Sequence, residues 1–318
     1  MTVRTAGWLR DGAPESFVIG ANLPWVGYGT DFGASAWSPE GGLAADPQRL
    51  ARLDQTFARL ACDRIAVVRV FVLCDLRSGV RFDADGLPTG VDDALFADLD
   101  ALIVTARRQH VRLMPVLLDF HLCHPPKVID GVQIGGRSDL VVTGEGRSAF
   151  IESVLTPVAR RYADEEAIAA WDVMNEPEWC LRLSASRRVR DPFGLLQVFL
   201  AGAVSCLRAN ARQPVTVGCA GTWQLDLVRS LGLDVYQVHW YERFGWARLA
   251  QPVSQLGLDR PVLLGEFSGR TTPVDVVLDT ARRAGYRGAF VWSVLADDDQ
   301  SGYPPEFVNW SAAQDPSG

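Results

Sequence analysis

Two glutamates stand at the ends of two short apolar segments of the chain. Glu176 follows the run 168–174 and precedes Pro177, which cannot donate to a strand ladder. Glu266 closes a second apolar run within residues 261–267. Runs of this length are typical of buried strands. Two carboxylates at the same ends of two parallel strands can face each other across a pocket, and such a facing pair is what glycoside hydrolysis requires.

The chain around these glutamates alternates strand-like segments with segments of helical periodicity. We expect eight strands, at residues 17–21, 65–73, 111–118, 168–174, 214–219, 235–239, 261–267 and 288–295. We expect one helix after Asp46 as its N-cap with Pro47 at the first helical position, and another capped by Thr272-Pro273. Further helices are expected at 93–109, 148–163, 191–212, 224–231, within 247–256 and at 305–313. Eight parallel strands with right-handed helical crossovers close into a barrel. The prediction is an α/β protein, a (β/α)8 TIM barrel whose site lies at the carboxyl ends of the strands.

Composition supports one globular domain over residues 1–318. The chain has 318 residues, of which 48% are hydrophobic and 22% charged, and we find no linker that would divide it. Residues 1–16 are expected to form a small hairpin cap, because an Asp-Gly turn stands between apolar flanks. The six cysteines show no CxxC spacing, so we interpret them as reduced and structural.

The charge of the chain bears on its partners. A formal charge of -7 disfavours nucleic acid and anionic membrane surfaces, which both reward basic patches. We therefore expect a neutral partner.

No stretch resembles a signal peptide or approaches a membrane span. A cytoplasmic location is therefore expected for the sequence as it stands, and a secreted one if a signal has been trimmed.

Arg69 lies in the otherwise apolar run 67–71. Burying an unpaired guanidinium is costly, so Arg69 needs a carboxylate partner. A purely structural ion pair would satisfy that need, and so would pairing with a carboxylate of the site.

Further side chains at strand ends fit a sugar site, namely Asp119, His121, Asn175, His239, Tyr241 and Trp292. Together with Arg69 and the two glutamates, the patterns Asp-x-His, Asn-Glu-Pro and His-x-Tyr resemble the retaining glycosidases of clan A, and most closely glycoside hydrolase family 5. The resemblance covers residues 17–295. It implies a retaining β-glycosidase that acts on a β-linked glucan, mannan or related glycoside, with no cofactor and no metal. Its partner would be an oligosaccharide, polysaccharide or glycoside.

The resemblance also implies a role for each catalytic residue. Glu176 would be the acid/base, and Glu266 would be the nucleophile that forms a covalent glycosyl-enzyme. Arg69 would hold the nucleophile ionised and oriented, and the hydroxyl of Tyr241, in the His239-x-Tyr241 motif, would donate to it.

Three residues would bind the sugar. By the same resemblance, Asn175 would hydrogen-bond the 2-hydroxyl, His121 would line the first subsite, and Trp292 would stack under the reacting ring. Six further tryptophans near strand tops are as consistent with packing as with sugar contact: Trp25, Trp37, Trp179, Trp223, Trp240 and Trp246.

Other polar residues near the strand ends have plainer interpretations. Glu178 is expected to be solvated, and Asp297, Asp298 and Asp299 form a polar rim or a solvated turn. The arginines after the fourth strand are expected to form a solvated face, with an acidic-sugar site as the alternative: Arg182, Arg187, Arg188 and Arg190. The long loop 124–146 can carry a hairpin of its own at the barrel mouth.

Two other classes of function compete with this interpretation. One is a carbohydrate-binding barrel that has lost catalysis, which the complete set of acid, nucleophile and supporting residues disfavours. The other is a metal-dependent hydrolase. Asp119, His121, Cys123 and His124 offer ligands, but they crowd into six residues without a second pair elsewhere, and no His-x-His follows the first strand.

Overall fold

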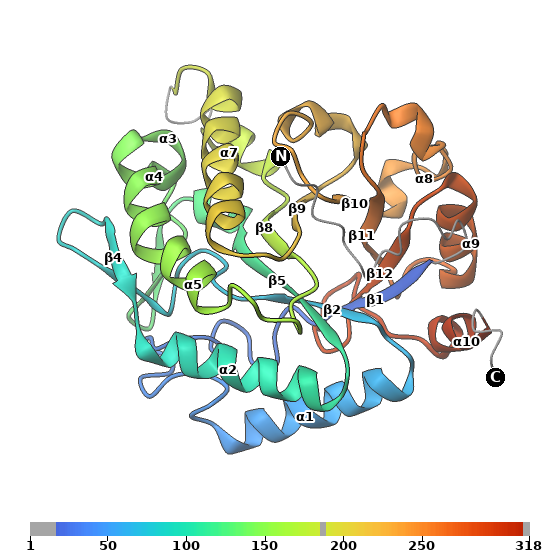
Figure 1. The fold of residues 1–318 in the computed structure, drawn as a ribbon, viewed down its shortest axis with the longest axis horizontal. Helices are drawn as coiled ribbons and strands as arrows, with labels where there is room; N and C mark the ends of the chain where they lie inside the picture. The colour runs from blue at the N-terminus through green and yellow to red at the C-terminus, as the bar shows by residue number, and fades with distance from the viewer. Residues whose placement is uncertain (1–16, 185–188, 314–318) are drawn as a thin grey trace.

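A computed structural model describes residues 17–184 and 189–313, so the expected hairpin within 1–16 lies outside the described residues, as do Arg187 and Arg188. Eight parallel strands form a closed barrel in the spatial order β1-β12-β11-β10-β9-β8-β5-β2. Figure 1 shows β1, drawn in blue, beside β12, drawn in red, where the barrel closes. The strands are β1 (Val18–Asn22), β2 (Val67–Phe71), β5 (Arg112–Asp119), β8 (Trp171–Asn175), β9 (Val215–Cys219), β10 (Tyr236–His239), β11 (Val262–Ser268) and β12 (Gly288–Trp292). The predicted (β/α)8 barrel is confirmed.

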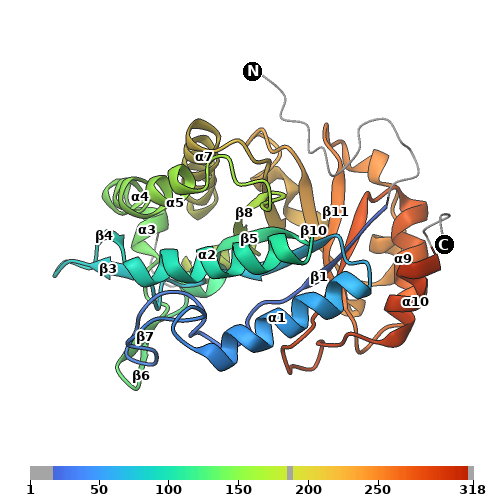
Figure 2. The ribbon, with the colours of Figure 1, turned by 60° about the horizontal axis from the view of Figure 1, so that its bottom comes forward.

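Helices cover the outside of the barrel. They are α1 (Pro47–Cys62), α2 (Asp93–Arg108), α3 (Asp139–Val142), α4 (Gly144–Phe150), α5 (Thr156–Arg161), α6 (Glu178–Ser184), α7 (Pro192–Asn210), α8 (Trp246–Leu249), α9 (Val274–Ala284) and α10 (Pro305–Ala313). Figure 2 shows α1 and α2 side by side along one flank, as their packing contacts require. Asp46 caps α1 by accepting hydrogen bonds from two backbone amides, with Pro47 in the first turn, as the sequence predicts.

Three of the predicted helices differ from the structure. The range 148–163 is interrupted by a π-helical turn, η2 (Ile151–Leu155), because Pro157 has no amide hydrogen to continue the regular ladder. The range 224–231 is the 3-10 helix η4 (Thr222–Leu227). The range 247–256 holds only α8 and the 3-10 turn η6 (Val253–Leu256), which Gly257 ends in the left-handed region at φ 64°.

The cap predicted for α9 is also wrong. Thr272 does not cap the helix, because its hydroxyl donates to the carbonyl of Ser268 instead. The residue at the cap position is Pro273, which makes no side-chain capping bond.

Two hairpins extend the loops at the strand ends. The pair β6 (Lys127–Ile129) and β7 (Val132–Ile134) is antiparallel and confirms the hairpin expected within the loop 124–146. Its turn has Asp130 at φ 45° and Gly131 at φ 80°, the conformation of a tight two-residue turn. A second hairpin, β3 (Val80–Phe82) with β4 (Pro88–Val91), was not predicted.

The core has two parts. Side chains inside the barrel form a small cluster of Val18, Val67, Met114, Ala169, Ala170, Val235, Leu263 and Phe290. A larger cluster fills the space between strands and helices. Helix α7 belongs to that layer, because it packs on β8 and β9 and buries Phe199 and Leu200. Among the described helices it alone has the length and apolarity of a membrane span, so the expectation that no stretch approaches one is wrong.

Candidate active site

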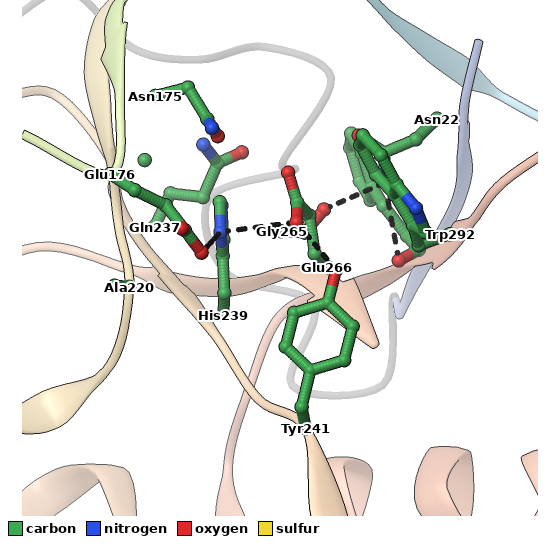
Figure 3. Close-up of polar contacts among 12 residues, drawn as sticks. Asn22, Asn175, Glu176, Ala220, Gln237, His239, Tyr241, Gly265, Glu266 and Trp292 are labelled. Carbon is green, nitrogen blue, oxygen red and sulfur yellow. Dashed lines mark hydrogen bonds and ion pairs between the residues drawn. The ribbon is translucent and has the colours of Figure 1, made fainter. Parts of the chain in front are cut away.

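The two strand-end glutamates meet at one end of the barrel. Glu176 follows the last residue of β8, and Glu266 lies within β11. A carboxylate oxygen of each lies within 4.8 Å of the other and of a ring nitrogen of His239. Figure 3 shows the imidazole between the two glutamates. This separation matches the roughly 5–5.5 Å of retaining glycosidases and is well short of the roughly 6.5–9.5 Å of inverting ones.

Glu176 adopts an uncommon backbone conformation. Its φ is 45°, in the left-handed region that residues other than glycine seldom occupy. The backbone amide of Glu176 donates to the carbonyl of Gly218 on β9 (2.6 Å), which holds the chain at this point. The chain leaves β8 sharply here, and Pro177 prevents the strand from continuing.

Arg69 on β2 pairs with two carboxylates inside the barrel. Its side chain has no exposed surface, and it donates to Asp172 (2.8 Å) and Glu266 (2.6 Å). It also donates to the side-chain oxygens of Asn22 (3.1 Å) and Asn175 (2.8 Å). Burial alone lowers the pKa of Arg69, but the two carboxylates outweigh burial and the pKa is raised. Arg69 is therefore permanently charged at the site.

Asp172 is a partner that the sequence analysis missed. It is fully buried on β8, accepts from Arg69 and Gln237, and also accepts from the amide of Gly218 (3.1 Å). The signal in the sequence was a carboxylate within the apolar run 168–174, which could have been matched with the cation within the apolar run 67–71. Only the barrel brings the two runs together, with β5 between them.

Glu266 is held by donors on three sides. Besides Arg69, the hydroxyl of Tyr241 donates to it (2.7 Å), and His239 Nδ1 lies 3.4 Å away. Burial raises the pKa of Glu266, while His239, Arg69 and the hydroxyl of Tyr241 act in the opposite direction. Burial, followed by the charge of Glu266, raises the pKa of Tyr241 well above its usual value, so the phenol keeps its proton and remains a donor.

Both carboxylate oxygens of Glu176 accept hydrogen bonds. His239 Nδ1 lies 2.9 Å from Oε1, and the indole nitrogen of Trp179 donates to Oε2 (2.6 Å). Since Nδ1 faces carboxylates, the ring proton belongs on that nitrogen. The sequence analysis gave Trp179 only a general place near the strand top and missed this contact.

Glu178 is not solvated, contrary to the prediction. Only 4% of its surface is exposed, and its carboxylate accepts from the backbone amide of Ala220. Burial raises the pKa of Glu178 to about 7, against opposing hydrogen bonds from backbone amides. The turn after Glu176 directs this side chain inward, which no sequence pattern indicates.

A cavity of about 440 Å³ opens beside the two glutamates. Its lining includes Asn175, His121 and Trp292, which the sequence analysis assigned to sugar binding, and also Trp25, Tyr28 and Phe71. The side-chain amide of Asn175 accepts from Arg69 and donates to Asp119 (2.8 Å), which leaves one N–H for a ligand. Trp25 and Tyr28 come from the loop after β1, whose part in the cavity was not predicted beyond the presence of Trp25.

The aromatic and basic residues near the mouth divide between lining and packing. Trp292 donates from its indole nitrogen to Asp298 (3.0 Å), and both line the cavity. Trp240 is 3% exposed and belongs to the core, so packing is its role. Arg182 is exposed and lies over the ring of Trp179, 4.5 Å from its centroid.

The crowded ligands of the loop do not form a metal cluster. His121 Nδ1 is paired with Asp119, and the ring of His121 stacks on Phe120. Within the described ranges, the one group with metal-ligand spacing is Glu176, His239 and Glu266. Its arrangement is equally that of a histidine donating to two carboxylates.

Comparison with known proteins places this geometry in context. No family model matches the chain. A "Mannan endo-1,4-beta-mannosidase" of Mytilus edulis is 24% identical over 330 residues, covering 87% of this chain and 83% of the relative. A protein of the same description from Cryptopygus antarcticus is 24% identical over 341 residues, covering 91% and 83%.

Solved structures show the same fold. The endo-1,4-beta-mannanase from Eisenia fetida superimposes with a TM-score of 0.74 at 23% identity, covering 93% of this chain and 90% of its own. A "Glycoside Hydrolase Family 5 Mannosidase" from Rhizomucor miehei gives 0.59 at 15% identity, covering 95% and 98%. The closed barrel with two facing glutamates is the geometry that a retaining glycoside hydrolase requires. The relatives' names support the resemblance to glycoside hydrolase family 5, and the solved structures show that the fold is shared.

The raised pKa of Glu178 predicts a pH-dependent stability. Between pH about 4.5 and about 7 the folded protein holds a proton on Glu178 that the unfolded chain releases, so this group lowers the free energy of unfolding as pH rises. Glu178→Gln removes the effect and keeps an oxygen for Ala220. Between these two pH values the free energy of unfolding of the variant, measured with urea, should rise by roughly 2–3 kcal/mol relative to that of the parent protein.

The matched control is Glu242→Gln, which changes an exposed glutamate. Its free energy of unfolding should equal that of the parent protein at every pH. If Glu178→Gln did the same, the buried carboxyl would not be taking up a proton in this range.

Proposed function

We propose that the protein is an endo-acting β-mannanase that hydrolyses β-1,4-mannosidic bonds with retention of configuration. The observation that carries the proposal is the pair of strand-end carboxylates within 4.8 Å of each other beside a cavity of about 440 Å³. The named activities of the relatives support mannan as the substrate class.

In the first step, Glu176 acts as general acid and Glu266 as nucleophile. Glu266 attacks the anomeric carbon while Glu176 protonates the departing glycosidic oxygen, giving a covalent glycosyl-enzyme. Arg69 and Tyr241 donate to Glu266 in the free enzyme, which stabilises its ionised form and fixes its orientation.

In the second step, Glu176 acts as general base. It takes a proton from water, the water attacks the anomeric carbon, and Glu266 leaves as a carboxylate. The remaining N–H of Asn175 is placed to bind the sugar's 2-hydroxyl, and the part-exposed ring of Trp292 offers an apolar face for the reacting sugar.

The inactive carbohydrate-binding barrel is the less favoured alternative. Glu266 is 3% exposed and held by a cation and a phenol, an arrangement that costs free energy without helping to bind a neutral sugar. A substrate panel separates the two. The protein should release oligosaccharides from β-1,4-mannan and far less sugar from cellulose or xylan, whereas a binding barrel would retain mannan without cleaving it.

The roles of the two glutamates can be separated with a substrate whose leaving group is an acidic phenol. Glu176→Ala should largely spare formation of the glycosyl-enzyme and slow its hydrolysis about 10²–10⁴-fold, since only the second step needs the residue. With azide it should yield a β-mannosyl azide. Glu266→Ala should lose both steps and yield an α-mannosyl azide, because azide then attacks the substrate directly.

Product NMR with a dinitrophenyl β-mannoside provides the readout, and Glu178→Gln serves as the control variant because it changes a neighbouring carboxyl without touching either glutamate. The same azide anomer from both alanine variants would refute the assignment of roles.

A further inference from the structure

The acid/base glutamate has a neighbour that the reaction scheme does not use. Trp179, the second residue of α6, donates its indole N–H to Glu176 Oε2 at 2.6 Å. The backbone amide of Trp179 also donates to the carbonyl of Glu176 (3.1 Å), so the two residues form a closed turn. The indole is partly buried and lies three positions along the chain from the carboxylate that it contacts.

The chemistry of an indole N–H gives this contact a direction. Indole nitrogen donates a hydrogen bond and cannot accept one. A donor of this kind is held more tightly by a charged carboxylate oxygen than by a neutral one, so it favours the ionised form. Glu176 needs its proton for the first step and must be without it for the second. A donor to Oε2 therefore shifts the equilibrium between the protonated and ionised forms of Glu176.

Other groups that face Glu176 do not provide this donor. His239 donates to Oε1 but also approaches Glu266, so it serves both carboxylates. Glu178 and Glu266 bring negative charge, and the protonated groups of Tyr241 and Cys219 lie nearby. Within 17–184 and 189–313, Trp179 is therefore the side-chain donor that acts on Glu176 alone.

The ring of Trp179 is itself held in place. The guanidinium of Arg182, one turn further along α6, lies over the indole at 4.5 Å. The ring of Trp223, from η4, lies 6.4 Å away at a tilt of 57°. These contacts fix the direction of the N–H, because an indole packed from two sides has few alternative rotamers.

We propose that Trp179 is a positioning residue that orients the acid/base carboxylate and sets the alkaline limit of activity by favouring its ionised form. The inference rests on the proposed function, since it concerns how Glu176 holds and releases a proton. Trp179 acts through Glu176 and takes no proton itself.

The test is the pH profile of kcat/KM, which reports on the free enzyme whose contacts are described above. Trp179→Phe keeps an aromatic ring for Arg182 and removes the N–H together with the five-membered ring that carries it. The alkaline limb of the profile should move to higher pH by roughly one unit, as the loss of a hydrogen bond to a charged group requires. Trp310→Phe, the matched control, removes another indole that donates to a carboxylate, that of Asp279 outside the cavity lining, and should leave the limb in place.

The readout distinguishes positioning from mere packing. A packing residue would lower kcat/KM by the same factor at every pH, and that parallel loss, or an unmoved limb, would overturn the proposal. The rates are divided by the fraction of folded enzyme measured at each pH, and Trp179→Met repeats the test if the phenylalanine variant does not fold. If the parent enzyme cleaves no β-mannoside at all, the proposed function fails instead, which is a separate outcome.

Discussion

The ion pairs of Arg69 are the interaction on which the catalytic end of the barrel depends. A fully buried guanidinium on β2 reaches Asp172 on β8 and Glu266 on β11, strands that are not its neighbours in the barrel. Removing one partner from such a buried pair typically costs about 3–5 kcal/mol, because the other charge is left without compensation. The network therefore fixes the positions of three strand ends relative to one another, and with them the position of Glu266.

The second consequence is electrostatic. Buried carboxyl groups gather near this end of the barrel, and burial disfavours the ionised form of a carboxyl group. Arg69 forms ion pairs with Asp172 and Glu266, while His239 lies between Glu266 and Glu176. Glu178 accepts from the backbone amide of Ala220, and burial raises its pKa to about 7. The neighbouring glutamates Glu266 and Glu178 thus differ in their partners, a cation for the first and a backbone amide for the second.

The sequence predicted the fold and the central residues because both depend on local patterns. Apolar runs that end in Asn-Glu-Pro or Gly-Glu mark strand ends, and parallel strands bring those ends together. Asp172, Glu178 and Trp179 were missed or misread, because their roles depend on partners from other strands and on the direction that the chain takes after Glu176, whose φ is 45°. The interrupted helix at 148–163 was missed because Pro157 stands inside a segment with regular helical periodicity.

The central claim is that two carboxylates this close perform hydrolysis with retention. The stereochemistry of the first-formed product tests it most directly, because proton NMR separates the two anomers before they interconvert. With a β-mannoside as substrate, the account predicts that the β-anomer of the sugar appears first and that the α-anomer accumulates only as the product mutarotates. Initial release of the α-anomer would show a single displacement by water and would contradict the account, whatever the distance between Glu176 and Glu266.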